Sequence, residues 1–220
     1  MRRKEILLIF NIFELGIKEG EKNAYVAVGK NNITKSVFND KGTLGMYLVQ
    51  EKGKPNMTYM FEVYEDEKSY QEHIKSEQYK EFLRQSPTIL TNHKKKIQVM
   101  PEYMGDKKFV QTRNTRVNYV TVDVKERFND TFREIVLDEM KQSIKKEEGV
   151  YVIYAATATG NPNKWYFFEI YENEKAYQKH RKTAHFKKYI EQTENIIENK
   201  EFINIEGVIL LNKGNLNYVK

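Results

Sequence analysis

Two stretches of this chain read almost identically: YMFEVYEDEKSYQEHIKSEQY at residues 59–79 and YFFEIYENEKAYQKHRKTAHF at residues 166–186. The offset between them is 107 residues (166 − 59), and it continues without a gap across most of both halves of the chain. Identical pairs at this offset include Asn11 and Asn118, Gly42 and Gly149, Glu62 and Glu169, and His73 and His180. Solenoid units repeat every 20–50 residues or so, and this longer period therefore indicates a duplicated domain.

The second copy shows the predicted order of elements most clearly. Residues 117–125 alternate and are rich in β-branched side chains, which predicts a strand. The segment from Asn129 to Gly149 has apolar residues at helical spacing and stops at the glycine. Turn residues separate two further strands and predict a hairpin. These strands span 150–158 and 164–172, a second helix is predicted from about 174 to 199, and residues 202–211 close the copy.

The first copy gives the same order at lower clarity. Its first helix contains Gly29 and several β-branched residues, so helix propensity alone would not predict it, and the register with the second copy supports it instead. The predicted strands are 6–17, 43–51, 57–65 and 96–104, and the helices are 21–39 and 67–86.

The order β-α-β-β-α-β is that of the ferredoxin-like arrangement, an α+β fold. Its helices cover one face of the sheet, so the other apolar face needs a partner. We therefore expect two ferredoxin-like domains, at 1–105 and 113–220, that pack sheet to sheet as an intramolecular dimeric α/β barrel.

Composition excludes several classes of function. The 220 residues include no cysteine, which rules out disulfides, thiolate metal sites and cysteine nucleophiles. The net charge is +6, but lysine and glutamate alternate along the chain rather than forming a basic patch, so we expect no nucleic-acid partner. Asn11 and Glu14 interrupt the apolar start, and no window approaches the roughly 20 apolar residues of a membrane span. A cytoplasmic protein without a membrane partner is expected.

The motifs of the second copy resemble those of the antibiotic biosynthesis monooxygenase domain, in particular its quinol-monooxygenase-like branch. That family has Glu-Gly before the second strand, Glu followed by an aromatic residue at the end of the third strand, and a helix with the pattern A-x-x-x-H-x-x-(S/T)-x-H-(F/M). The matching residues here are Glu148, Gly149, Glu169, Tyr171, Ala176, His180, Thr183, His185 and Phe186. The first copy matches less closely, with Gln78 in place of the second histidine.

The resemblance implies a cofactor-free oxygenation of an electron-rich aromatic molecule, such as a quinol or an anthrone. In that chemistry the deprotonated substrate reduces dioxygen directly, and the protein supplies a dry pocket and a proton acceptor. We therefore expect dioxygen as co-substrate, no cofactor and no metal, and a small aromatic substrate as the partner. Further homo-oligomerisation stays open. The alternatives are a non-catalytic small-ligand-binding or stress-related module, or an isomerase or lyase on the same scaffold.

We predict the site in the second copy. The catalytic candidates are His185, His180, Tyr171 and Asn118, and the substrate-binding candidates are Trp165, Phe167, Glu169 and Phe186. Each has a plainer interpretation. His180 can be a structural histidine like its counterpart His73, His185 can be a surface residue, Glu169 can be a partnered carboxylate, and Asn118 can cap a strand edge.

Two kinds of metal site are disfavoured, one by the spacing of the histidines and one by the residues at the expected ligand positions. His180 and His185 are five residues apart, about 500° of rotation on one continuous helix, and would not share a face. The related haem-degrading branch is expected to have a tryptophan at the end of the third strand and a histidine late in the second helix. Those positions are Tyr171 and Ile190, so haem is not expected.

Overall fold

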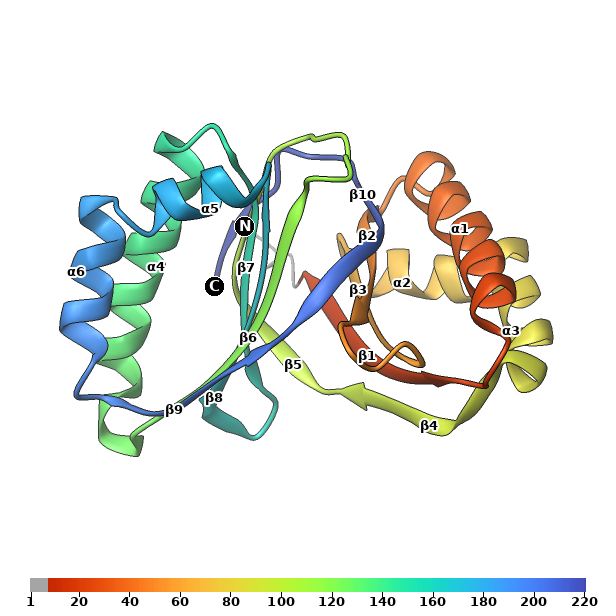
Figure 1. The fold of residues 1–220 in the computed structure, drawn as a ribbon, viewed down its shortest axis with the longest axis horizontal. Coiled ribbons are helices and arrows are strands. Elements are labelled where there is room, and N and C mark those ends of the chain that lie inside the picture. Colours follow the sequence, from red (N-terminus) through yellow and green to blue (C-terminus); the bar gives the residue numbers. More distant parts are fainter. Residues whose placement is uncertain (1–7) are drawn as a thin grey trace, which may run out of the picture. The chain divides into compact units, whose positions relative to one another are not determined.

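The computed structural model describes residues 8–220 and divides them into two compact units (Figure 1). The first unit contains residues 8–98 and 206–214, and the second contains residues 99–205 and 215–220. The beginnings of the strand expected at 6–17 and of the domain expected at 1–105 lie outside the described residues. None of the helices in the described part of the chain is long and apolar enough to cross a membrane.

The first unit has the predicted order of strands and helices. Its elements are β1 (Ile9–Ile17), α1 (Lys22–Asn39), β2 (Thr43–Glu51), β3 (Met57–Tyr64), α2 (Glu67–Ile74), α3 (Glu77–Ile89), β4 (Leu90–Ile97) and, from the end of the chain, β10 (Ile205–Asn212). The strand order in the sheet is β10-β2-β3-β1-β4, and β1 to β4 pair antiparallel.

The second unit repeats this arrangement. Its elements are β5 (Val99–Asp106), β6 (Arg116–Val124), a 3-10 turn η1 (Glu126–Phe128), α4 (Asn129–Lys146), β7 (Val150–Ala158), β8 (Asn161–Tyr171), α5 (Glu174–His180), α6 (Ala184–Thr193), β9 (Ile197–Ile203) and β11 (Asn217–Val219). The strand order is β11-β5-β7-β8-β6-β9, and β7 and β8 form the predicted antiparallel hairpin. Two ferredoxin-like halves of the α+β class are confirmed.

Helices cover one face of each sheet, with α1 to α3 on the first and α4 to α6 on the second (Figure 1). The buried positions of α1 and α4 recur at three- and four-residue spacing, as expected for helices packed on a sheet. Polar residues occupy part of these buried faces. Asn32 of α1 and Glu139 of α4 are both less than a tenth exposed, and they are equivalent positions of the two copies. The packed face of each unit therefore carries polar groups as well as a core.

The second helical region of each copy is broken, which the sequence prediction missed. The helix expected at 67–86 is two helices, α2 and α3, and the one expected at 174–199 is α5, α6 and the strand β9. Ser76 and Thr183 start the new helices as N-caps, because their hydroxyls accept from the backbone N–H groups of Tyr79 and Phe186. The break brings the end of α5 close to the start of α6.

Each sheet takes a strand from the other copy. The strand expected at 96–104 is divided at Gln98 into β4, which pairs with β1, and β5, which pairs with β7 of the second unit. In return β10, from the second copy, lies beside β2 in the first sheet. The expected domain limits of 1–105 and 113–220 are contiguous in sequence, whereas each unit of the structure combines residues from both halves.

Candidate functional site

The first unit contains an apolar cavity of about 260 Å³ between its helices and its sheet. Exposed Leu83 and Lys94 belong to its wall, so the cavity reaches the surface. Eight of its lining residues are apolar: Phe13, Leu15, Ile33, Leu48, Met60, Phe82, Leu83 and Leu90. The polar ones include Tyr25, Asn32, Glu62, Tyr79 and Ser86. A mainly apolar cavity with a few polar groups is the usual form of a small-molecule site.

Glu62 is the ionisable group of greatest interest in this cavity. It lies on β3 opposite Asn11 of β1, and it is buried. Burial raises the pKa of Glu62 to about 7, although the Tyr64 hydroxyl, which donates to the carboxylate at 2.9 Å, opposes this shift. A carboxyl group with a pKa near neutrality is suited to accept and release protons at physiological pH.

The equivalent space of the second unit is almost filled. A cavity of only about 40 Å³ remains there, lined by Phe167, Glu169, His180 and Phe186 among others. Val136 stands where the first copy has Gly29, and Trp165 stands where it has Thr58. The indole of Trp165 is fully buried, stacks on Phe167 with ring centroids 5.9 Å apart, and donates to Asn129 Oδ1 at 3.1 Å. Larger side chains therefore occupy the volume that is open in the first unit.

Trp165 consequently lies in the hydrophobic core, and it is absent from the walls of the small cavity. Tyr171 and Asn118 are buried and share one partner, since the Tyr171 hydroxyl donates to Glu169 Oε2 at 2.9 Å and Asn118 Nδ2 donates to the same oxygen at 3.1 Å. Arg116 Nε donates in turn to Asn118 Oδ1 at 3.0 Å. Three of the predicted site residues thus form a polar network across β6 and β8.

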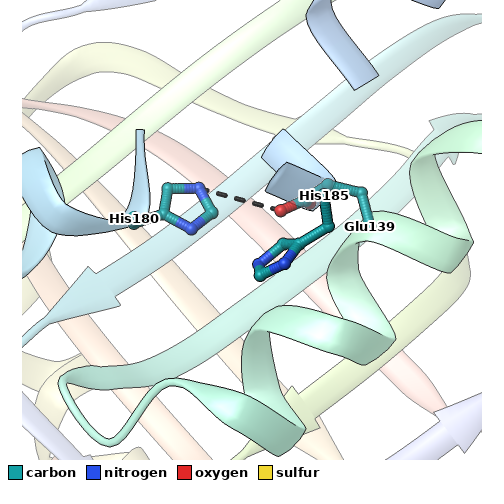
Figure 2. A group of neighbouring side chains, drawn as sticks. All are labelled: Glu139, His180 and His185. Carbon is teal, nitrogen blue, oxygen red and sulfur yellow. Dashed lines mark ion pairs between the residues drawn. The ribbon is translucent and has the colours of Figure 1, made fainter. Parts of the chain in front are cut away.

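His180 and His185 are brought together at the break between α5 and α6, with their ring centroids 6.4 Å apart. Both contact one carboxylate oxygen, Glu147 Oε1, at 3.0 Å from His180 Nδ1 and 2.7 Å from His185 Nε2. The other nitrogen of His180, Nε2, lies 3.8 Å from Glu139 Oε1, the ion pair drawn in Figure 2. The Ser143 hydroxyl donates to Glu139 Oε1 at 2.6 Å. We call Glu139, Glu147, His180 and His185 the His–Glu cluster.

Burial and mutual charge set the protonation of the His–Glu cluster. Burial raises the pKa of Glu139 to about 7, despite the opposing effect of His180. Burial also favours a neutral Glu147, but hydrogen bonds from His180 and His185 outweigh it and leave the Glu147 pKa below its ordinary value. Burial alone would lower the pKa of His180, whereas its hydrogen bond to Glu147 and the nearby Glu139 raise it overall. An ion pair between His180 and Glu147 is the favoured state.

The corresponding place in the first unit has a different chemistry. Its residues are Asn32, Ser36, Asp40, His73 and Gln78 in place of Glu139, Ser143, Glu147, His180 and His185. Gln78 Nε2 donates to Asp40 Oδ2 at 3.1 Å. His73 is fully buried, its Nδ1 lies 3.7 Å from Asp40 Oδ2, and burial lowers its pKa to about 4. Among the described residues neither ring nitrogen of His73 has a hydrogen-bond partner.

The sequence prediction missed Glu139 and Glu147 in the second copy and Glu62, Asn32 and Gly29 in the first. Glu139 carried a usable signal, because it falls three residues after Val136 and seven after Phe132, on the apolar face of the predicted helix. Glu147 carried no such signal, since it follows the helix and reaches the histidines only through the fold.

Comparison with known proteins agrees with this architecture. The sequence profile described as antibiotic biosynthesis monooxygenase matches the chain twice, at residues 8–85 and 115–192. No match was found among curated proteins.

Two solved structures are similar over almost the whole chain. A candidate monooxygenase from Lactobacillus acidophilus NCFM is 28% identical with a TM-score of 0.91, covering 96% of this chain and 99% of its own. A candidate monooxygenase from Fusobacterium nucleatum subsp. nucleatum is also 28% identical with a TM-score of 0.91, covering 98% of this chain and 99% of its own.

An anthrone oxidase-like protein has a TM-score of 0.56 at 10% identity, covering 96% of this chain and 95% of its own, and this likeness concerns the fold alone. The family profile, in contrast, matches most of the chain in two consecutive copies that coincide with the two ferredoxin-like halves. The chain therefore belongs to the antibiotic biosynthesis monooxygenase family, as a tandem duplication of its domain.

Proposed function

We propose that this protein is a cofactor-independent monooxygenase that oxygenates an electron-rich aromatic molecule, of the quinol or anthrone kind, in the cavity of the first unit. Family membership supports a monooxygenase-like role. The observation that carries the proposal is the apolar cavity of about 260 Å³ with buried Glu62 in its wall. For comparison, an apolar cavity of about 150 Å³ accommodates benzene. The cavity of about 40 Å³ in the second unit is far below that size.

Glu62 is the general base in this proposal. Its carboxylate takes a proton from the bound substrate, and the resulting anion is electron-rich enough to reduce dioxygen. A carbon–oxygen bond forms to give a peroxide, and cleavage of the oxygen–oxygen bond with loss of water leaves a new carbonyl group. One oxygen atom enters the product and the other leaves as water, so the substrate supplies all the electrons. The protein contributes the base, the orientation of the ring and the exclusion of bulk water.

The other polar groups of the cavity wall are suited to orient the substrate. Asn32 lies on α1, and its side-chain amide can donate to a developing oxyanion. Tyr25 and Tyr79 add hydroxyl groups on the helical side of the cavity. The apolar side chains around them, such as Phe13 and Phe82, favour an aromatic ring over a charged metabolite.

The test is oxygen uptake by the purified protein with a panel of hydroquinones and anthrones. We expect uptake with at least one of them, with kcat/KM rising as the pH increases through about 7, because the general base must be deprotonated. Glu62→Gln should lower kcat by 100-fold or more.

Glu169→Gln is the matched control, because Glu169 is the equivalent carboxylate of the second unit. It should retain activity if the first-unit cavity is the site. Loss of activity in Glu169→Gln with an active Glu62→Gln would place the reaction in the second unit. Saturable binding of the aromatic molecules with no uptake would instead support a non-catalytic binding module.

A further inference from the structure

We propose that the His–Glu cluster of the second unit binds one divalent transition-metal ion of the zinc class, through Glu139, His180 and His185. This inference concerns a place separate from the first-unit cavity, and it stands or falls independently of the oxygenation proposed above. Imidazole nitrogens with one carboxylate oxygen suit Zn²⁺ and its first-row neighbours, whereas Mg²⁺ and Ca²⁺ prefer oxygen ligands throughout.

The three side chains converge from three helices. Glu139 lies in α4, His180 ends α5, and His185 is the second residue of α6 (Figure 2). One donor atom from each lies within 4.8 Å of the others. Ligand atoms around a tetrahedral ion with bonds of about 2.0–2.2 Å are roughly 3.4 Å apart, close to the 3.8 Å between His180 Nε2 and Glu139 Oε1. Small side-chain movements would complete the geometry.

Glu147 provides the support that metal-binding histidines usually have. A carboxylate has only acceptor atoms, so the ring nitrogens that face Glu147, His180 Nδ1 and His185 Nε2, are the ones that carry hydrogen. The opposite nitrogens, His180 Nε2 and His185 Nδ1, are then left to face an ion. Because the ion pair with Glu147 favours a charged His180 ring, metal binding would displace the proton on His180 Nε2. A histidine held in its tautomer by a carboxylate is the typical outer contact of a zinc site. The Ser143 hydroxyl donates a hydrogen bond to Glu139 Oε1 and so holds the orientation of that carboxylate.

An ion can reach the cluster from the surface. A depression of about 200 Å³ is lined by both Glu139 and His185. Its walls include Glu134 and Asp138, whose negative charges attract a cation, together with Lys188. The proposed ligands are themselves mostly buried, with His180 and Glu139 each less than a tenth exposed. The cluster therefore combines an approach route with a largely desolvated binding place.

The first copy shows what the same scaffold looks like without the ligands. The serine and the first histidine are shared by both copies as Ser36 and His73. The two other ligand positions are occupied by the amides Asn32 and Gln78, which are poor ligands for zinc-class ions. Substitution between the copies thus falls on two of the three proposed ligands, and the first unit supplies the design of a matched variant.

The test uses full-length protein freed of metal by dialysis against a chelator. Titration with Co²⁺ should give visible d–d absorption that saturates at one ion per chain, and Zn²⁺ should abolish it by competition. The double variant Glu139→Asn/His185→Gln, which installs the first-copy residues, should bind Co²⁺ at least 100-fold more weakly. His93→Gln is the control, because His93 is an exposed histidine paired with Glu14 outside the second unit, and it should bind as the wild type does.

In the first unit the Gln78 side chain donates a hydrogen bond to Asp40. A glutamine at position 185 can donate in the same way to Glu147, so the fold should tolerate this substitution. Circular dichroism checks this, and His185→Gln alone replaces the double variant if the latter does not fold. Absence of saturable Co²⁺ absorption in the wild type would overturn the proposal. So would unchanged affinity in the folded variant that lacks the ligands.

Discussion

Glu62, the proposed general base, is a buried carboxyl group that lowers the stability of the fold when it is charged. Its ordinary pKa of 4.5 applies in the unfolded chain, and burial raises the pKa to about 7 in the folded protein. Between these two values the folded state binds more protons than the unfolded state, so the free energy of unfolding falls as the pH rises from 4.5 to 7. Above pH 7 the carboxylate is charged in both states, and the loss remains constant.

Glu62→Gln should therefore stabilise the protein at alkaline pH. The pKa difference corresponds to about 3 kcal/mol as an upper value, because one pKa unit is worth about 1.4 kcal/mol. Urea unfolding at pH 8 should show the variant to be more stable than the wild type, and unfolding at pH 4.5 should show little difference. Glu19→Gln, which removes an exposed carboxylate, is the control and should show no such pH dependence. Equal stability differences at both pH values would refute the argument.

At the scale of single residues, the sequence predicted the polar residues of the candidate site better than it predicted the volumes of the two cavities. The spacing of His180 and His185 argued against a shared site on one helix, but Thr183 begins a new helix and the two rings meet at the break. The smaller cavity accompanies larger side chains at two positions, where Val136 and Trp165 stand in place of Gly29 and Thr58. These side chains come from separate elements and fill or leave a common volume, which no local pattern records.

At the scale of elements, α1 is the helix that shapes the first-unit cavity. Gly29 lies in its interior, where a glycine costs about 1 kcal/mol of helix stability relative to alanine. A Cβ atom added at this position would meet only Leu48 Cδ2, at an ordinary contact distance of 3.5 Å. The glycine is therefore not required by close packing, and its effect is to leave the cavity wall open.

Gly29→Val, which installs the second-copy residue, should fill part of the cavity. We expect the KM for an accepted aromatic substrate to increase at least tenfold, while the melting temperature stays the same or rises. Gly29→Ala is the milder control and should raise the melting temperature with a smaller effect on KM. Steady-state oxygen uptake and thermal unfolding measure both quantities. If Gly29→Val is folded and its KM is unchanged, the substrate does not bind in this cavity.

The order of elements was predicted from the sequence because the elements assigned in the second copy could be placed in the first copy at the offset of 107 residues. The divided strand at Gln98 was not predicted, because β4 and β5 together read as one polar-to-apolar extended segment. Only pairing with different sheets distinguishes them. The fold class can thus be predicted from the regular offset of the repeat. The sheet to which each strand belongs depends instead on pairing between residues far apart in the sequence.

At the scale of the whole molecule, neither repeat contains all the strands of its sheet. The first sheet includes β10 from the second repeat, and the second sheet includes β5 from the first. Without the exchanged strand, β2 of the first repeat or β7 of the second would become an edge, which exposes backbone hydrogen-bonding groups and favours pairing with another chain. Each repeat expressed alone is therefore incomplete at one edge.

Fragments 1–112 and 113–220 should accordingly form a one-to-one complex when they are produced together. Produced separately, each should self-associate or aggregate, since its own exchanged strand can pair only with another copy. Size-exclusion chromatography with light scattering distinguishes these states, and the intact chain is the control. A fragment that is monomeric and fully folded by circular dichroism would show that the exchanged strand is dispensable.

The strand exchange also bears on how the two copies can change over time. A deletion that removed one repeat would take a strand from the sheet of the survivor, either β10 from the first sheet or β5 from the second, so both repeats are expected to persist as a pair. Substitutions at positions such as Gln78 and Trp165 alter only the local chemistry of one half and leave the strands intact. The architecture thus allows one gene to keep two halves of unequal chemistry, each free to specialise although neither can be lost.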